Sequence, residues 1–190
     1  MGEADKSPAQ AGGGPTSEDQ TDTRERLLAA ALKHFAERGF HGASIAGIAG
    51  DLGLTKQALL YYFKRKQDLY GEVVRVIGEG IVSALRSRVD PAAPPAQQIE
   101  TMVLVLYENA QANPYNSRFL MHELLENQRR EAQPDQWFIK NFLDLCVGTL
   151  DRIDGLAERP FAQKFAVVYQ MISAIQYFTA SGPVLKRFYG

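Results

Sequence analysis

The sequence contains a single cysteine, Cys146, and no long apolar run. One cysteine excludes a disulfide within the chain and suits a reducing cytosol. The longest apolar stretches, residues 27–32 and 102–107, are far shorter than the ~20 residues that cross a bilayer. No apolar segment typical of a secretory signal follows the charges near the N-terminus. We therefore expect a cytoplasmic protein that does not interact with a membrane.

The sequence also lacks the recurring patterns of enzymes and metal proteins. It has no phosphate-binding loop, no Cys/His cluster, and no nucleophile placed near a histidine and a carboxylate at a recognisable spacing. Residues 122–126 resemble the helix of a zinc protease, but Glu126 stands where such a helix has its second histidine. We expect no catalytic residue, no bound metal and no cofactor, and we do not expect an enzyme.

A strong net charge is absent as well, but the charges are distributed unevenly. Residues 1–22 carry a net charge of −4, whereas residues 23–75 carry nine Lys or Arg against five Asp or Glu, a net charge of +4. Residues 76–190 carry a net charge of −1. A basic segment beside a nearly neutral one favours a polyanionic partner, although a surface excess of this size also arises by chance.

Apolar residues recur with the helical period along almost the whole chain from Asp22 onward, and no segment alternates with period two. Residues 1–21 are rich in Gly, Ser, Thr and acids, so we expect a disordered acidic tail. Pro and Gly then divide the chain into helices, which predicts an all-α protein. The expected helices begin with 22–39, 44–52, 55–63 and one from about residue 66, and the later ones include 135–154 and 160–179.

The segment 44–63 has the spacing of a helix-turn-helix. Ala49 leaves room where the two helices cross, and Gly53 provides the positive φ of the tight turn. Ser44 and Thr55 are placed to cap the two helices. The exposed face of the second helix would then carry Thr55, Lys56, Gln57 and Tyr61 into a major groove. The alternative is an ordinary helical corner, which would not explain the basic residues 64–66 just downstream.

Residues 22–75 resemble the DNA-binding domain of the Tet repressor (TetR) family of bacterial transcriptional regulators. The matching features are the first-helix end at 35–40, the start at 44–49, the turn at 52–56, and the run Tyr62-Phe63 followed by Lys66 and Leu69. The resemblance implies a homodimer that binds double-stranded operator DNA, with Lys66 at a phosphate. The set of expected DNA contacts is Ser44, Thr55, Lys56, Gln57, Tyr61, Tyr62 and Lys66.

Two positions depart from the pattern of the TetR family. Leu60 occupies the position of a tyrosine that contacts the DNA backbone in many relatives, so this contact shifts to Tyr61 or is lost. Gly47 replaces a longer and often polar residue, and it costs the second helix about 0.5–1 kcal/mol relative to alanine.

For residues 76–190 the resemblance implies a helical domain that binds a small-molecule effector and forms the dimer. The helices at 135–154 and 160–179 are apolar on more than one face, which favours a dimer over a monomer core that uses both faces. Aromatic residues and residues with polar tips are candidates for the effector pocket, although core packing explains each of them singly: Tyr107, Phe119, His122, Trp137, Phe138, Asn141, Tyr169, Ser173 and Gln176.

We expect Cys146 to be a buried small hydrophobe, and His34 and His41 to be surface or packing residues. The aromatic residues beside Gly190 suggest that the natural protein continues into a further helix.

Taken together, these features predict a transcriptional regulator, usually a repressor, that releases or binds DNA in response to a ligand. A DNA-bound structural or partner-binding protein of the same fold, without an effector, is the main alternative. An enzyme built on the same bundle is a second alternative, but the sequence offers it no visible site.

Overall fold

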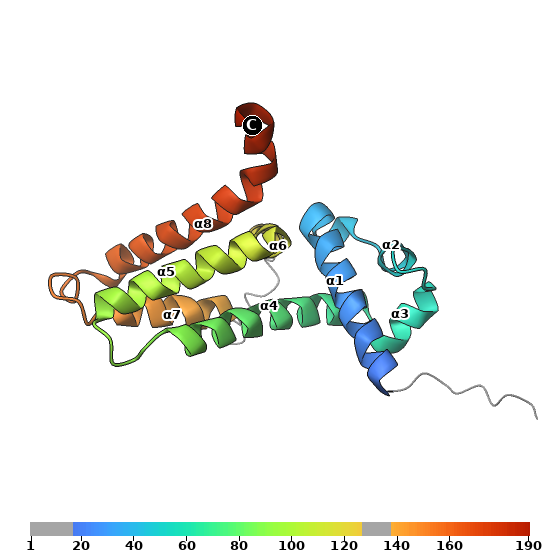
Figure 1. Cartoon of the computed structure of the whole chain (residues 1–190), viewed down its shortest axis with the longest axis horizontal. Helices are drawn as coiled ribbons and strands as arrows, with labels where there is room; N and C mark the ends of the chain where they lie inside the picture. The colour runs from blue at the N-terminus through green and yellow to red at the C-terminus, as the bar shows by residue number, and fades with distance from the viewer. Residues whose placement is uncertain (1–16, 127–137) are drawn as a thin grey trace, which may run out of the picture.

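The computed structural model describes residues 17–126 and 138–190, and these residues form helices, turns and loops with no strand. The all-helical prediction is therefore confirmed for this part of the chain. In the described residues three helices form the N-terminal part, a long helix leads out of it, and four more helices complete a bundle (Figure 1). In chain order they are α1 (Ser17–Gly42), α2 (Ile45–Gly50), α3 (Lys56–Tyr62), α4 (Lys66–Arg88), α5 (Pro95–Ala112), α6 (Pro114–Glu126), α7 (Phe138–Leu150) and α8 (Phe161–Tyr189).

Helix α1 begins at Ser17, five residues before the predicted start at Asp22, so residues 17–21 are helical rather than part of a disordered tail. Glu18 and Asp19 lie in the first turn, where negative charge interacts favourably with the helix dipole. Asp22 lies inside the helix and pairs with Arg26 at 3.7 Å, in the i,i+4 relation that supports a helix. Residues 1–16 of the predicted tail lie outside the described residues.

The core of the N-terminal part follows the predicted helical faces. Leu27, Ala31 and Phe35 from α1 are fully buried, as are Ile48 and Ala49 from α2. Gly39 has a φ of 66° and interrupts the helical geometry of α1 at the residue where the first helix is predicted to end. The buried small side chain of Ala49 leaves the predicted room at the crossing of the two short helices.

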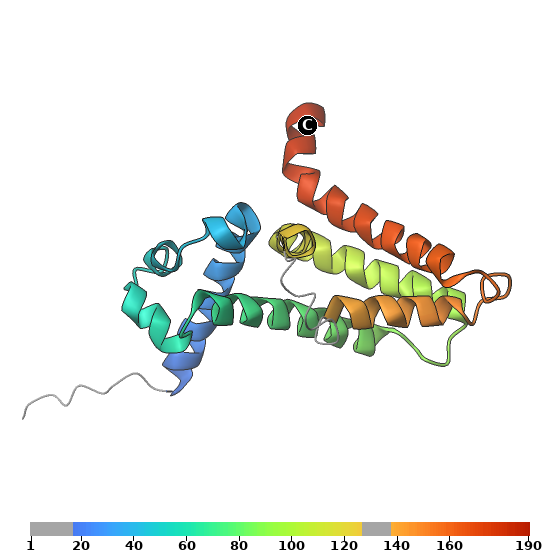
Figure 2. The ribbon, with the colours of Figure 1, turned by 180° about the vertical axis from the view of Figure 1, so that it is seen from behind.

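Helix α4 runs from the N-terminal part into the C-terminal bundle without a break, as seen from behind in Figure 2. Its Glu72 binds Arg24 of α1 and lies 2.7 Å from Arg75 one turn further along α4. Hydrogen bonds from Arg75 and Arg24 lower the pKa of the Glu72 carboxyl from its usual value of 4.5 to about 2, against the opposing effect of burial. Glu72 therefore joins the first and fourth helices by an ion pair.

We expect Glu72→Gln to destabilise the protein at neutral pH by about 1 kcal/mol, since the site is partly open to solvent and water screens part of the interaction. The folded-state pKa is below the ordinary one, so this stability is present above pH 4.5 and is lost as the pH falls toward about 2. Urea unfolding between pH 7 and pH 3 measures the effect. The matched control is Glu79→Gln, which removes an exposed partner of Arg75 and should change stability by less than about 0.5 kcal/mol. Equal losses in both variants at pH 7 would contradict a special role for Glu72.

The C-terminal bundle packs α5, α6 and α7 against α8. Helix α4 ends at Arg88 and Pro95 opens α5, because proline fits the first turn of a helix but not its interior. Cys146 of α7 is buried beside Met102, and burial raises the pKa of its thiol to about 12. This confirms the expectation of a small buried hydrophobe, since a thiol with this pKa stays protonated and unreactive at neutral pH.

The last two helices differ in length from the prediction. Helix α7 ends at Leu150, four residues early, because residues 151–159 form successive turns. Helix α8 continues to Tyr189, ten residues beyond the predicted end, with Pro183 inside it. Proline bends a helix because it lacks the N–H that would bond to the carbonyl four residues earlier, and the end of α8 turns away from the bundle in Figures 1 and 2.

No helix among the described residues is both long enough and apolar enough to cross a membrane.

Candidate nucleic-acid interface and ligand cavity

The turn between α2 and α3 has the geometry that the sequence predicts. Gly53 adopts a φ of 68°, a conformation that glycine reaches without the clash of a Cβ atom. The Leu54 amide donates to the Ala49 carbonyl at 2.9 Å, and the Gly53 amide donates to the Gly50 carbonyl at 3.0 Å. These bonds close a tight turn, so α2 and α3 are held at a fixed angle to one another.

Both predicted caps form. The Ser44 hydroxyl accepts a hydrogen bond from the Gly47 amide at 3.0 Å, and the Thr55 hydroxyl accepts one from the Ala58 amide at 3.1 Å. Each bond satisfies an amide that has no partner within its own helix. Both residues remain exposed, so their predicted contacts with DNA stay predictions.

The outer face of α3 is exposed and carries the predicted reading residues. Lys56 and Gln57 lie exposed in its first turn, and Tyr61 is 75% exposed one turn later. The Tyr61 ring stands edge-on against Tyr62, with 5.4 Å between ring centroids, and Tyr62 is half-buried against the core. The side of α3 that faces the protein is fixed by Leu59, which is fully buried. The orientation of α3 therefore directs its polar residues outward.

Lys66 opens α4 and is held more closely by the protein than the sequence suggests. Its ammonium lies 3.4 Å from the His41 carbonyl and 4.6 Å from the centre of the Phe40 ring. Partial burial lowers the pKa of this lysine. Its neighbour Arg65 pairs with Asp68 at 2.6 Å, and Lys64 is exposed. The lysine thus ties the end of α1 to the start of α4, and its predicted contact with a phosphate stays a prediction.

His34 and Asp51 form a contact that the sequence does not predict. His34 of α1 is 4% exposed, and its Nε2 lies 2.9 Å from a carboxylate oxygen of Asp51, the residue after α2. The hydrogen bond from His34 lowers the pKa of the Asp51 carboxyl. This pair fixes α1 to the helix-turn-helix. Its signal in the sequence is weak, because the two residues lie 17 positions apart and have no characteristic spacing.

Gly47 of α2 lies next to His34 of this pair. A Cβ atom at this position would lie 3.0 Å from the Ser44 hydroxyl oxygen and 3.3 Å from Cε1 of His34. The missing side chain, which the sequence presents only as a weakness of the helix, therefore leaves space for the cap and for the buried histidine.

We expect Gly47→Ala to be about 1 kcal/mol less stable than Gly50→Ala, because the new methyl group displaces the Ser44 cap. Gly50 is the matched control, since it lies in the same helix and a Cβ atom there meets nothing within 4 Å. Gly50→Ala should stabilise the protein by up to about 0.5–1 kcal/mol, because alanine reduces the conformational freedom of the unfolded chain. Thermal unfolding of the two variants measures the difference, and equal midpoints would show that the space beside Gly47 is not required.

An aromatic cluster joins the N-terminal part to the C-terminal bundle. The Tyr70 ring of α4 lies 4.9 Å from Phe35 of α1 and 4.9 Å from Phe119 of α6, measured between centroids. The Tyr70 hydroxyl donates a 2.6 Å hydrogen bond to the buried carboxylate of Glu123, also on α6. Phe119, which the sequence analysis placed among the pocket candidates, is fully buried in this cluster and not in the cavity described next. Helix α6 is therefore packed directly on α1 and α4, the helices that come before and after the helix-turn-helix in the chain.

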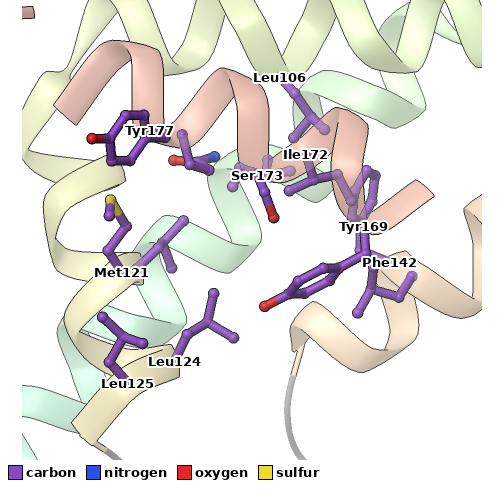
Figure 3. Close-up of a pocket in the computed structure, with 13 residues that line it drawn as sticks. Leu106, Met121, Leu124, Leu125, Phe142, Tyr169, Ile172, Ser173 and Tyr177 are labelled. Atoms are coloured by element: carbon purple, nitrogen blue, oxygen red, sulfur yellow. The ribbon is translucent and has the colours of Figure 1, made fainter. Parts of the chain in front are cut away.

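A cavity of about 210 Å³ lies between α6 and α8 (Figure 3). Tyr169 and Ser173 from α8 face Met121 and Leu124 from α6 across it. Its lining is almost entirely apolar and comes from α4 to α8: Ile81, Leu106, Leu120, Met121, Leu124, Leu125, Phe142, Leu143, Tyr169, Ile172, Ser173, Gln176 and Tyr177. Leu124 had only a helical period as its signal in the sequence, and a period does not distinguish the wall of a cavity from a packed core.

The structure brings three of the predicted pocket residues to the cavity, namely Tyr169, Ser173 and Gln176. Tyr107 and Asn141 are exposed, and His122 is half-buried. None of the three lines this cavity, whose lining on α5, α6 and α7 consists of other residues of these helices. Phe138 begins α7, but its side chain is not among those described, and Trp137 lies outside the described residues.

Among the described residues, no group of three or more His, Cys, Asp or Glu side chains is arranged to hold a metal ion.

The fold and the site together define a helix-turn-helix protein with a helical C-terminal part that contains a cavity. Residues 27–73 match the model of a family described as bacterial regulatory proteins, tetR family. Over these residues the chain is similar to the tetR family.

Similar proteins share the domain and the fold. The HTH-type transcriptional regulator RutR of Escherichia coli (strain K12) is 34% identical over 102 residues, which are 54% of this chain and 48% of RutR. The chain thus spans about half the length of the curated relatives it matches first. The structure of KstR2, a ketosteroid transcriptional regulator of Mycobacterium tuberculosis, superposes with a TM-score of 0.67 at 22% identity, covering 83% of this chain and 81% of KstR2. A TetR-like regulator from Rhodococcus sp. RHA1 gives a TM-score of 0.68 at 20% identity over 83% and 82% of the two chains.

Proposed function

We propose that this protein is a sequence-specific DNA-binding transcriptional regulator, and that it acts as a repressor controlled by a small molecule. The observation that carries the proposal is the exposed face of α3. A tetR-type domain holds Lys56, Gln57 and Tyr61 outward on a short helix with both ends fixed, beside the exposed base Lys64. Helices held in this way read base edges in a major groove. In this proposal residues 22–75 bind operator DNA in the cytoplasm.

Residues 76–190 would form a homodimer. The surface of α8 supports this part of the proposal, because large apolar side chains remain exposed along most of its length, including Phe161 at 61%, Tyr177 at 67% and Phe178 at 55%. A two-fold pairing would bury such a surface against its own copy. It would also place two copies of α3 on one side of the dimer, so that they reach successive major grooves about 34 Å or more apart.

The cavity supports ligand control. Helix α6 provides Leu120, Met121 and Leu124 to the cavity, while Phe119 and Glu123 of the same helix contact the aromatic cluster at α1 and α4. A ligand that prefers one position of α6 would therefore shift α1 and α4, and with them the exposed face of α3. The coupling between ligand and DNA is typically 1–3 kcal/mol in such systems. The alternative of a structural or partner-binding protein without effector gives no reason for a cavity of this volume.

Selection of bound sequences from a pool of random duplexes tests the proposal. We expect enrichment of a near-palindrome, because each subunit of a symmetric dimer reads one half-site. Binding to the selected duplex should then weaken steeply between low and high salt, since each phosphate contact releases counterions. Enrichment of no sequence at low salt would refute DNA reading by α3, and a selected site without two-fold symmetry would refute the dimer.

A further inference from the structure

The cavity between α6 and α8 is uncharged. None of its described lining residues is an acid, a base or a histidine. Moving an ionised group from water into such surroundings is strongly unfavourable unless an opposite charge or several hydrogen bonds compensate. The lining therefore selects against carboxylates, phosphates and ammonium ions and favours an uncharged molecule.

The few polar groups of the cavity lie along one face of α8. Tyr169, Ser173, Gln176 and Tyr177 follow one another at helical spacing, while the opposite wall on α6 is wholly apolar in its described lining. The side-chain oxygen of Gln176 is buried and has no hydrogen-bond partner among the described residues. A buried acceptor without a partner is costly, and a ligand that draws the Gln176 amide toward the cavity and donates a hydrogen bond to it would remove this cost.

The volume sets the size of the ligand. A cavity of ~150 Å³ lined by aliphatic and aromatic side chains holds benzene. The 210 Å³ of this cavity therefore accommodates roughly eight non-hydrogen atoms by the same measure. A hydrocarbon chain of this size lies along the leucines of α6 and leaves its polar end at α8.

We propose that the ligand of this protein is an uncharged, largely hydrocarbon alcohol of medium size, with its hydroxyl bound to Gln176 and its apolar part between Leu124 and Ile172. The inference rests on the proposed ligand control and specifies its chemistry. A hydroxyl group both donates and accepts, so it satisfies the Gln176 amide in either orientation of that group.

Three probes of equal chain length test the class of ligand: 1-octanol, its methyl ether, which lacks the donor, and octanoate at pH 8, which carries a charge. Calorimetric titration of the full chain in the absence of DNA measures their affinities. We expect 1-octanol to bind several-fold more tightly than the ether, and more than about tenfold more tightly than octanoate. Binding of 1-octanol should also raise the midpoint of thermal unfolding.

Two pairs of variants locate the site. Leu124→Trp fills the cavity and should abolish binding of 1-octanol, whereas Leu104→Trp, at a similarly exposed leucine of α5 outside the cavity lining, should not. Gln176→Glu places a charge at the anchor and should weaken 1-octanol by about tenfold or more. Its control, Gln170→Glu, changes an exposed glutamine of the same helix outside the lining and should leave the affinity unchanged.

The outcomes separate this inference from the proposed function. Octanoate binding as tightly as 1-octanol, binding of none of the probes, or binding that survives Leu124→Trp would each overturn the ligand class or its site, whatever the result of the DNA selection. Specific binding of 1-octanol supports the inference even if no duplex is enriched. If 1-octanol binds and leaves the affinity for a selected duplex unchanged, the ligand class stands and ligand control of DNA binding is refuted.

Discussion

Replacing Lys56 and Gln57 together by alanine is expected to remove the preference of this protein for its selected DNA sequence. Both side chains are exposed in the first turn of α3, where the geometry of a helix-turn-helix meets base edges. A good bidentate contact to a base discriminates by about 1–3 kcal/mol, so the loss of two lowers the specificity ratio by roughly a hundredfold or more. Thr55 is left in place because its hydroxyl caps the helix.

The measurement compares binding of the selected duplex and of a scrambled duplex at the same salt concentration. The double variant should bind both duplexes alike, while retaining the salt dependence that comes from phosphate contacts. The control Gln97→Ala/Lys186→Ala changes the same residue types at exposed positions far from α3 in the sequence and should keep the full preference. Undiminished preference in the first variant would show that another element reads the bases.

Replacing Phe119 by alanine is expected to destabilise the protein by about 3–5 kcal/mol, the range for truncating a buried phenylalanine. Phe119 is fully buried on α6, and its ring lies 6.3 Å from Phe35 and 4.9 Å from Tyr70. The substitution therefore leaves a cavity at the contact between the N-terminal part and the bundle. Its structural consequence is a loosened connection between α6 and the helices that support α3.

Urea unfolding followed by circular dichroism measures the loss. Tyr107→Ala is the matched control, because Tyr107 is an aromatic residue of the same bundle that is 43% exposed and should lose less than about 1 kcal/mol. Both residues carry the same signal in the sequence, an aromatic side chain on a helix, so the comparison isolates the effect of burial. Similar losses in the two variants would mean that Phe119 does not bear the contact between the two parts.

The parts of the structure that local chemistry determines could be predicted from the sequence. The caps at Ser44 and Thr55 and the positive φ of Gly53 depend on residues within four positions of one another. The early start of α1 is also local but was not predicted. The first-turn charges and the i,i+4 pair that support it are individually weak, and the composition of the tail is typical of disorder.

The cavity could not be predicted in the same way. Periodicity shows that a residue such as Phe119 faces the interior, but it does not show which neighbour covers it. Phe119 meets α1 and α4, whereas Leu124, little more than one turn further along α6, meets the cavity. The His34–Asp51 pair could not be predicted for the same reason, because it depends on how α1 crosses the end of α2. These contacts depend on the packing of helices that are distant in the sequence.

The uninterrupted course of α4 has a mechanical consequence. Its 23 residues correspond to a rod of about 34 Å at 1.5 Å per residue. A tilt of only about 5° at the bundle end of a rod of this length moves the opposite end by about 3 Å. A displacement too small to unpack the bundle is thus large enough to take side chains out of hydrogen-bonding distance of a base. A small rearrangement inside the bundle can therefore change which contacts α3 makes.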